Sequence, residues 1–368
     1  MKKRVQKDIE NLDLQPYDRT FLKSLEAHIG IILTTLNGLE SAFRQSHPPL
    51  FPKIRNALQP FRDRLSNSQK SFIQNRKNQN IENLSKHLDD IVARTEHALH
   101  YFFKEGDAQQ SIQNWMKSMR QHCRALESLY PLHRILKPVN RYFLEPEIRD
   151  RQEEFIIADK ADTGFFDEEG SSSISGGFTC FVPETYDGTA NWPLVIALHG
   201  GYGSGRDFIW YWLREARSRK FILVAPNSAG STWSFDNDTD QMSIDQMIAD
   251  ISRQYQTDSK KRLLTGFSDG AIFTLILGLK QNSPFTTLAP ISGVLHPISL
   301  NEAKHKRIYL AHGSWDWMFP VERAQQAADT LKKAGAQLVF KEVEQLSHTY
   351  PREENRSILN WFDISLSL

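Results

Sequence analysis

The sequence predicts an all-α helical domain over residues 1–150, followed by an α/β domain over residues 151–368 whose sheet is mostly parallel. A chain of 368 residues is long enough for about two domains. Before residue 150, apolar residues recur every three or four positions over long stretches, which is the period of amphipathic helices. After it, short apolar runs alternate with helical patterns. This repeated strand–helix order is typical of a parallel sheet with helices on both faces.

The first 150 residues favour a bundle of long helices. The clearest apolar stripe runs from Leu22 to Phe43 and predicts one helix that ends before Pro48. We expect a shorter helix over 51–65, interrupted near Pro60, and further helices over about 81–102 and 112–126. The histidines of this region do not have the spacing of a metal site in a bundle, so we predict no metal.

Composition and charge limit the classes of function. Residues 1–150 hold 24 Lys and Arg against 17 Asp and Glu, whereas residues 151–368 hold 21 against 27. The first surplus is modest and favours an ordinary solvated surface, so we expect no nucleic-acid partner. Two cysteines, Cys123 and Cys180, suit a reducing compartment. No apolar stretch is long enough to span a bilayer and no secretory apolar region follows the basic start, so we predict a cytoplasmic protein.

The second domain shows strand and helix patterns in alternation. We expect a loop over the acidic, Gly- and Ser-rich residues 161–177. The expected strands are 155–157, 178–182, 194–198, 221–225, 263–264, 286–291, 307–311 and 338–343. The expected helices are 206–220, 242–256, 271–282, 321–334 and 353–364.

The stretch Gly266-Phe267-Ser268-Asp269-Gly270 lies between an expected strand and an expected helix. In that order, G-x-S-x-G predicts a sharp turn that projects the serine hydroxyl above the sheet edge. The two glycines leave room for the turn. The N–H of Asp269, at the start of the helix, would point at an oxyanion formed on a substrate. Ser268 is therefore a candidate nucleophile.

Three further stretches follow expected strands, where partners of a nucleophilic serine are needed. His199-Gly200-Gly201 could bring a backbone N–H to a substrate carbonyl, although a plain turn also favours glycine. Asp316 could orient a histidine, or it could cap a helix or stabilise its own loop. His348 could act as the base, or it could be a loop histidine without a role. The chain order Ser268, Asp316, His348 favours the catalytic interpretation.

Taken together, these residues resemble the α/β-hydrolase superfamily over about residues 178–366. Within it, they resemble the phospholipase/carboxylesterase (acyl-protein thioesterase-like) and feruloyl esterase groups. The resemblance implies an α/β-hydrolase fold with a Ser268–Asp316–His348 triad and no cofactor. It also implies oxyanion N–H groups from Gly201 and Asp269, and substrate contacts from Trp233 and Tyr202. Many members have glycine before the catalytic histidine, where this chain has Ser347. The helical front is not part of the basic family.

The sequence therefore predicts a serine hydrolase that cleaves a carboxylic ester or thioester of a small-molecule or acylated substrate through an acyl-enzyme intermediate. A peptidase or a polyester depolymerase on the same fold is an alternative, because fold does not select the substrate. A second alternative is a binding protein whose helical domain is the functional part and contacts a protein partner. The role of residues 1–150 stays open.

Overall fold

The computed structural model describes residues 3–4, 19–76, 82–155, 162–170 and 176–368. The chain divides into a helical unit, Gln6–Ile156, and a sheet unit made of Met1–Val5 and Ile157–Leu368. The division predicted at residue 150 falls inside the 3₁₀ segment Pro146–Phe155. None of the helices in the described ranges combines the length and apolar character needed to cross a membrane.

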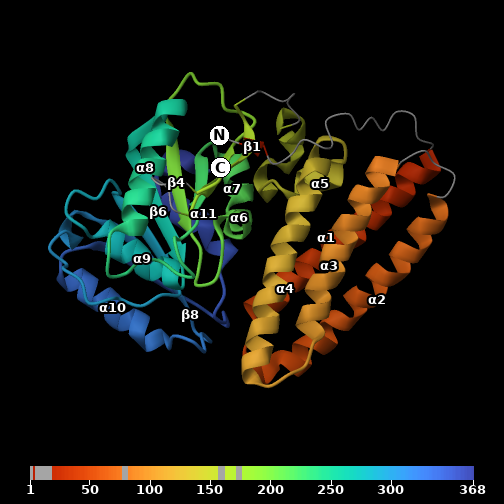
Figure 1. The fold of residues 1–368 in the computed structure, drawn as a ribbon, viewed down its shortest axis with the longest axis horizontal. Helices are drawn as coiled ribbons and strands as arrows, with labels where there is room; N and C mark the ends of the chain where they lie inside the picture. Colours follow the sequence, from red (N-terminus) through yellow and green to blue (C-terminus); the bar gives the residue numbers. More distant parts are fainter. Residues whose placement is uncertain (1–2, 5–18, 77–81, 156–161, 171–175) are drawn as a thin grey trace. The chain divides into compact units, whose positions relative to one another are not determined.

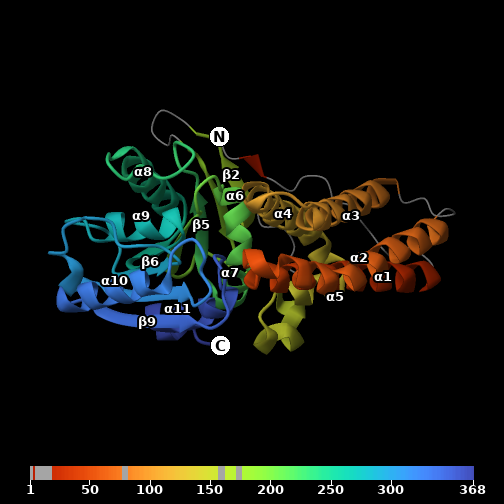
Figure 2. The same cartoon turned by 90° about the horizontal axis from the view of Figure 1, so that it is seen from below.

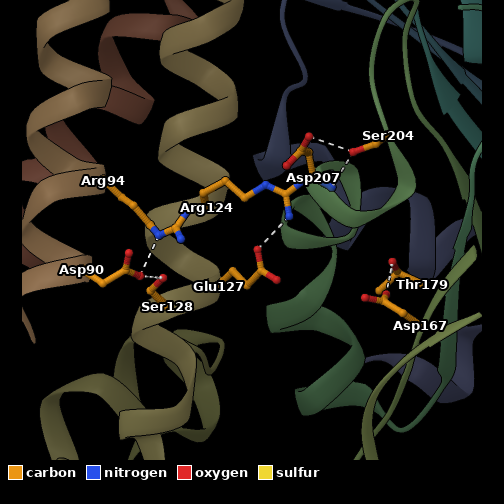
Figure 3. Close-up of polar contacts among 9 residues, drawn as sticks. All are labelled: Asp90, Arg94, Arg124, Glu127, Ser128, Asp167, Thr179, Ser204 and Asp207. Carbon is orange, nitrogen blue, oxygen red and sulfur yellow. Dashed lines mark hydrogen bonds and ion pairs between the residues drawn. The ribbon is translucent and has the colours of Figure 1, made fainter. Parts of the chain in front are cut away.

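The helical unit consists of long helices packed side by side (Figure 1). The apolar stripe of the first helix is buried from Leu25 to Phe43, as its spacing predicts, whereas at its start Phe21 is buried and Leu22 is half-buried. Asp90 accepts hydrogen bonds from Arg94 at 2.7 Å and from Ser128 at 2.6 Å, which links the third helix to the fourth (Figure 3). The helices are α1 Arg19–Arg44, α2 Phe51–Asn75, α3 Glu82–Phe103, α4 Ala108–Leu129 and α5 Lys137–Tyr142.

The predicted interruption of α2 at Pro60 is wrong, because this helix runs through the proline to Asn75. Proline removes one helical N–H and crowds the carbonyl four residues earlier. Pro60 lies on the exposed face, where water can solvate that carbonyl. Leu58 and Leu65, on the two sides of the proline, are both buried. Packing of both halves therefore maintains one helix.

Within the described residues, nine strands form one sheet in the order β1-β2-β3-β5-β4-β6-β7-β8-β9. In this order, each neighbouring pair from β5 to β9 is parallel, and the pairs β1–β2, β2–β3 and β3–β5 are antiparallel. This pairing confirms a mostly parallel sheet. The strands are β1 Lys3–Arg4, β2 Gly164–Glu168, β3 Phe178–Val182, β4 Trp192–Leu198, β5 Ile222–Pro226, β6 Thr257–Phe267, β7 Thr287–Ile291, β8 Arg307–Gly313 and β9 Gln337–Val343.

The loop predicted over 161–177 contains strand β2 instead. The Phe165 and Phe166 side chains are both buried, and the Thr179 hydroxyl donates to Asp167 at 2.6 Å across the β2–β3 pair (Figure 3). The acidic and glycine-rich neighbours concealed this short apolar pair in the sequence. Of the strand predicted at 155–157, Phe155 lies in the 3₁₀ segment, and residues 156–157 lie outside the described residues.

Helices cover both faces of the sheet (Figures 1 and 2). The apolar sides of α8, α9 and α10 share one core with the strands. On the opposite face, α7 contacts β3 and β5, and α11 contacts β8. The helix predicted over 206–220 is broken into α6, a 3₁₀ turn and α7. The helices are α6 Gly205–Phe208, α7 Leu213–Arg219, α8 Thr239–Gln254, α9 Asp269–Gly278, α10 Val321–Lys333 and α11 Asn355–Phe362.

Candidate active site

The turn between β6 and α9 holds Ser268 in a backbone conformation that L-residues rarely adopt, with φ 54° and ψ −119°. A Cβ on Gly266 would overlap the Gly270 carbonyl, and a Cβ on Gly270 would overlap the Leu198 carbonyl. Glycine is required at both positions because backbone passes where a side chain would begin. The Ser268 N–H donates to the Ile291 carbonyl at 3.0 Å, which ties the turn to the end of the neighbouring strand β7.

The structure brings Ser268, Asp316 and His348 together at the carboxyl ends of parallel strands. His348 Nε2 lies 3.0 Å from Ser268 Oγ, and His348 Nδ1 lies 2.8 Å from Asp316 Oδ2. A carboxylate only accepts hydrogen bonds, so Nδ1 carries the proton and Nε2 is free to accept the serine hydroxyl. All three residues are buried. The arrangement can remove a proton from the hydroxyl and stabilise the imidazolium that forms.

The Asp316 carboxylate is fixed by its own loop as well as by His348. Its Oδ1 accepts the N–H of Met318 at 3.0 Å and the N–H of Phe319 at 2.8 Å. The alternative role predicted for this aspartate, stabilisation of its own loop, is therefore present together with the contact to His348. The same carboxylate makes both sets of hydrogen bonds.

The loop after β4 carries the His199-Gly200-Gly201 stretch next to the serine. His199 Nε2 accepts the Ser228 N–H at 3.1 Å, so the ring proton resides on Nδ1, which donates to the Gly200 carbonyl at 2.7 Å. Burial lowers the pKa of His199, which favours this neutral form. Because a trans peptide is planar, fixing the Gly200 carbonyl directs the Gly201 N–H to the opposite side.

Gly200 and Gly201 approach the serine turn closely. A Cβ on Gly200 would lie 3.3 Å from Ser268 Cβ, and one on Gly201 would lie 2.5 Å from Asp269 Oδ2. Asp269 is the first residue of α9, so its N–H has no acceptor within the helix. The two backbone groups expected to bind an oxyanion are thus on adjacent segments.

Trp233 does not lie where the sequence led us to expect. Its side chain is only 2% exposed and stacks on Phe273 with ring centroids 5.3 Å apart. The indole N–H donates to the His199 carbonyl at 2.8 Å. Trp233 therefore supports the loop from within the core instead of presenting its ring to a substrate. Tyr202, which follows Gly201 in the loop after β4, is by contrast 70% exposed.

Sequence reasoning missed Asp240 and Thr232. Asp240, fully buried at the start of α8, accepts the Ala229 N–H at 2.7 Å and the Ser234 N–H at 2.6 Å. The loop held in this way brings the Thr232 hydroxyl to Asp269 Oδ2 at 2.6 Å. An aspartate in the apolar stripe of α8 was the available signal, because a buried carboxylate needs donors. The described parts of the chain contain no group of three or more side chains that could hold a metal ion.

Comparison with known proteins finds similarity for part of the chain. Residues 226–366, a range that includes Ser268, Asp316 and His348, match the phospholipase/carboxylesterase family model. This part of the chain is similar to the phospholipase/carboxylesterase group of α/β-hydrolases. The resemblance predicted from the sequence is thus confirmed.

The α/β-hydrolase part of the chain is similar to two curated proteins. It is 29% identical over 132 residues to a probable feruloyl esterase C of Aspergillus terreus, covering 34% of this chain and 49% of that protein. It is 29% identical over 175 residues to the bifunctional acetylxylan esterase/xylanase XynS20E of Neocallimastix patriciarum, covering 45% of this chain and 25% of that protein. The match therefore spans about half of one relative and a quarter of the other.

Among solved structures, the α/β-hydrolase part is similar to an acetyl xylan esterase from Aspergillus awamori. The TM-score is 0.46 and the sequence identity 16%, over 54% of this chain and 99% of that one. A ferulic acid esterase from Anaeromyces mucronatus gives a TM-score of 0.43 and 15% identity, over 57% of this chain and 93% of that one.

Proposed function

We propose that this protein is a serine hydrolase that cleaves carboxylic esters or thioesters through an acyl-enzyme intermediate. The observation that carries the proposal is the continuous hydrogen-bond chain from Ser268 Oγ through His348 to Asp316, set on a strained turn. A structural turn has no need of a buried histidine and carboxylate aligned on its serine. The similarity to a probable feruloyl esterase and to an acetylxylan esterase/xylanase supports ester chemistry.

The reaction would proceed in two halves. His348 Nε2 takes the proton of Ser268 as Oγ attacks the carbonyl carbon, and the N–H groups of Gly201 and Asp269 bind the oxyanion. The imidazolium then gives its proton to the leaving oxygen or sulfur as the bond to the carbonyl carbon breaks. Water gives a proton to the same histidine and attacks the acyl carbon, and the imidazolium then returns a proton to Ser268 Oγ as the acyl–oxygen bond breaks, which releases the acid and the free serine. Asp316 stabilises the imidazolium in both halves.

The test compares the full chain with its Ser268→Ala variant, using a fluorophosphonate probe and p-nitrophenyl esters. We expect the variant to lose labelling and to lose about 10⁶ of the turnover rate, because the triad acts as a unit. Ser231→Ala is a matched control, because Ser231 is exposed on a neighbouring loop. We expect this variant to keep both probe labelling and ester turnover. Labelling or turnover that persists in Ser268→Ala would refute the assignment. A series of acyl chain lengths, as oxygen esters and as thioesters, would then define the substrate.

A further inference from the structure

His312 lies one residue before the end of β8, beneath the Asp316 loop. Its side chain is completely buried. Its Nε2 lies 2.7 Å from the Phe319 carbonyl oxygen and 3.4 Å from Asp316 Oδ2. The catalytic steps above make no use of this ring, although it contacts the residue that orients the base.

The protonation of His312 follows from these contacts. A carbonyl oxygen can only accept, so Nε2 must carry the hydrogen that binds Phe319. Burial lowers the pKa of His312, although the Phe319 carbonyl and the Asp316 carboxylate oppose the shift. The ring is therefore neutral, with its N–H directed to the Phe319 carbonyl and facing the carboxylate.

His312 thereby closes a ring of contacts around Asp316. Phe319 donates its N–H to Asp316 Oδ1 at 2.8 Å, and its carbonyl accepts from His312. The Oδ2 atom lies 3.4 Å from His312 Nε2 and 2.8 Å from His348 Nδ1. Without the His312 donor, the Phe319 carbonyl would lose this partner, and the loop that shapes the carboxylate site would lose one of its attachments to β8.

We propose that His312 is a positioning residue that holds the Asp316 carboxylate in line with His348. The inference rests on the proposed function, since Asp316 acts there through His348. A neutral donor suits this task, because it holds the Phe319 end of the Asp316 loop without neutralising the charge that stabilises the imidazolium. A histidine that merely filled the core would need no donor directed at this carbonyl.

The test uses two substitutions of similar size. His312→Gln places an amide N–H near the position of Nε2, whereas His312→Leu fills the space without a donor. With p-nitrophenyl acetate, we expect His312→Leu to lower kcat about 10- to 100-fold with KM within about twofold, because a misplaced catalytic group slows chemistry more than binding. We expect His312→Gln to restore most of the rate. If both variants match the wild type, or if Gln is as slow as Leu, the proposal is wrong.

A double-mutant cycle separates positioning from general damage to the fold. Because His312 acts through Asp316, His312→Leu should change kcat by less than about twofold when Asp316→Asn is already present. If the leucine lowers kcat by the same factor in both backgrounds, the ring acts independently of Asp316 and the proposal fails. Should His312→Leu not fold, His312→Asn takes its place, because asparagine is too short to reach the Phe319 carbonyl.

A measurement without turnover keeps this inference distinct from the proposed function. The proton on His348 Nδ1, hydrogen-bonded to Asp316, should give a downfield proton NMR signal that disappears in His348→Gln. We expect the signal to persist in His312→Gln and to weaken or move upfield in His312→Leu. An unchanged signal in His312→Leu overturns the positioning role, whether or not Ser268 proves to be the nucleophile.

Discussion

The substitution Asp240→Asn tests how the loop over the oxyanion side of the site is held. Each oxygen of the buried carboxylate accepts one backbone N–H, from Ala229 and from Ser234. An asparagine offers one acceptor oxygen, so one of the two N–H groups would face an amide nitrogen. Losing a charge-assisted hydrogen bond costs about 1.5–3 kcal/mol. Removing the buried charge offsets part of this cost, which leaves about 1–2 kcal/mol.

The local effect is measured by hydrogen exchange of the peptide covering residues 227–238. A loss of 1–2 kcal/mol corresponds to roughly 5- to 30-fold faster exchange at the two amides. We also expect turnover of a p-nitrophenyl ester to fall, because the same loop carries Thr232 and Trp233. Asp236→Asn is the matched control, since Asp236 is exposed on that loop, and should change neither quantity. Exchange that stays within about threefold of wild type in Asp240→Asn would refute the reasoning.

Three further substitutions test the turn, the helical unit and the core beneath the site. Gly266→Ala should destabilise the fold by more than about 3 kcal/mol and abolish turnover, because its Cβ would overlap the Gly270 carbonyl. Gly230→Ala should be tolerated, because its Cβ would make only an ordinary contact, 3.6 Å from the Thr232 carbonyl oxygen. Burial lowers the pKa of His28 to about 4. Its contribution to the free energy of unfolding is therefore complete above about pH 6.5 and is lost as the pH falls towards 4. Wild type should therefore lose about 2 kcal/mol more than His28→Gln between pH 7.5 and 5 in urea titrations, and equal losses would contradict this. Trp233→Phe keeps an aromatic ring but loses the indole N–H bond, and should cost about 1 kcal/mol; unchanged stability would show that this bond contributes nothing.

The parts of the site that were predictable from sequence are those that local chemistry encodes. Ser268 lies between two glycines whose necessity follows from the turn itself. Asp316 and His348 follow apolar runs, and the carboxyl ends of parallel strands meet at one edge of a sheet. The distances between these three side chains could not be derived from the sequence, but their closeness at one edge of the sheet could.

The parts that were not predictable depend on contacts between distant segments. Nothing near Trp233 indicates that its ring points into the core, because that direction is set by Phe273 and by the His199 carbonyl. The role of Asp240 depends on the loop from Ala229 to Ser234, which folds over it and donates two backbone N–H groups to its carboxylate. Pro60 was judged by its local effect on a helix, whereas the packing of α2 on its neighbours prevailed.

The backbone of Ser268 has a consequence for how the chain would respond to selection. A residue with a Cβ at this φ and ψ costs about 1–3 kcal/mol, whereas glycine adopts such conformations readily. Selection for thermal stability alone would therefore favour glycine in place of this serine. Under the proposed function, selection for reactivity retains the hydroxyl against the conformational preference of its own backbone.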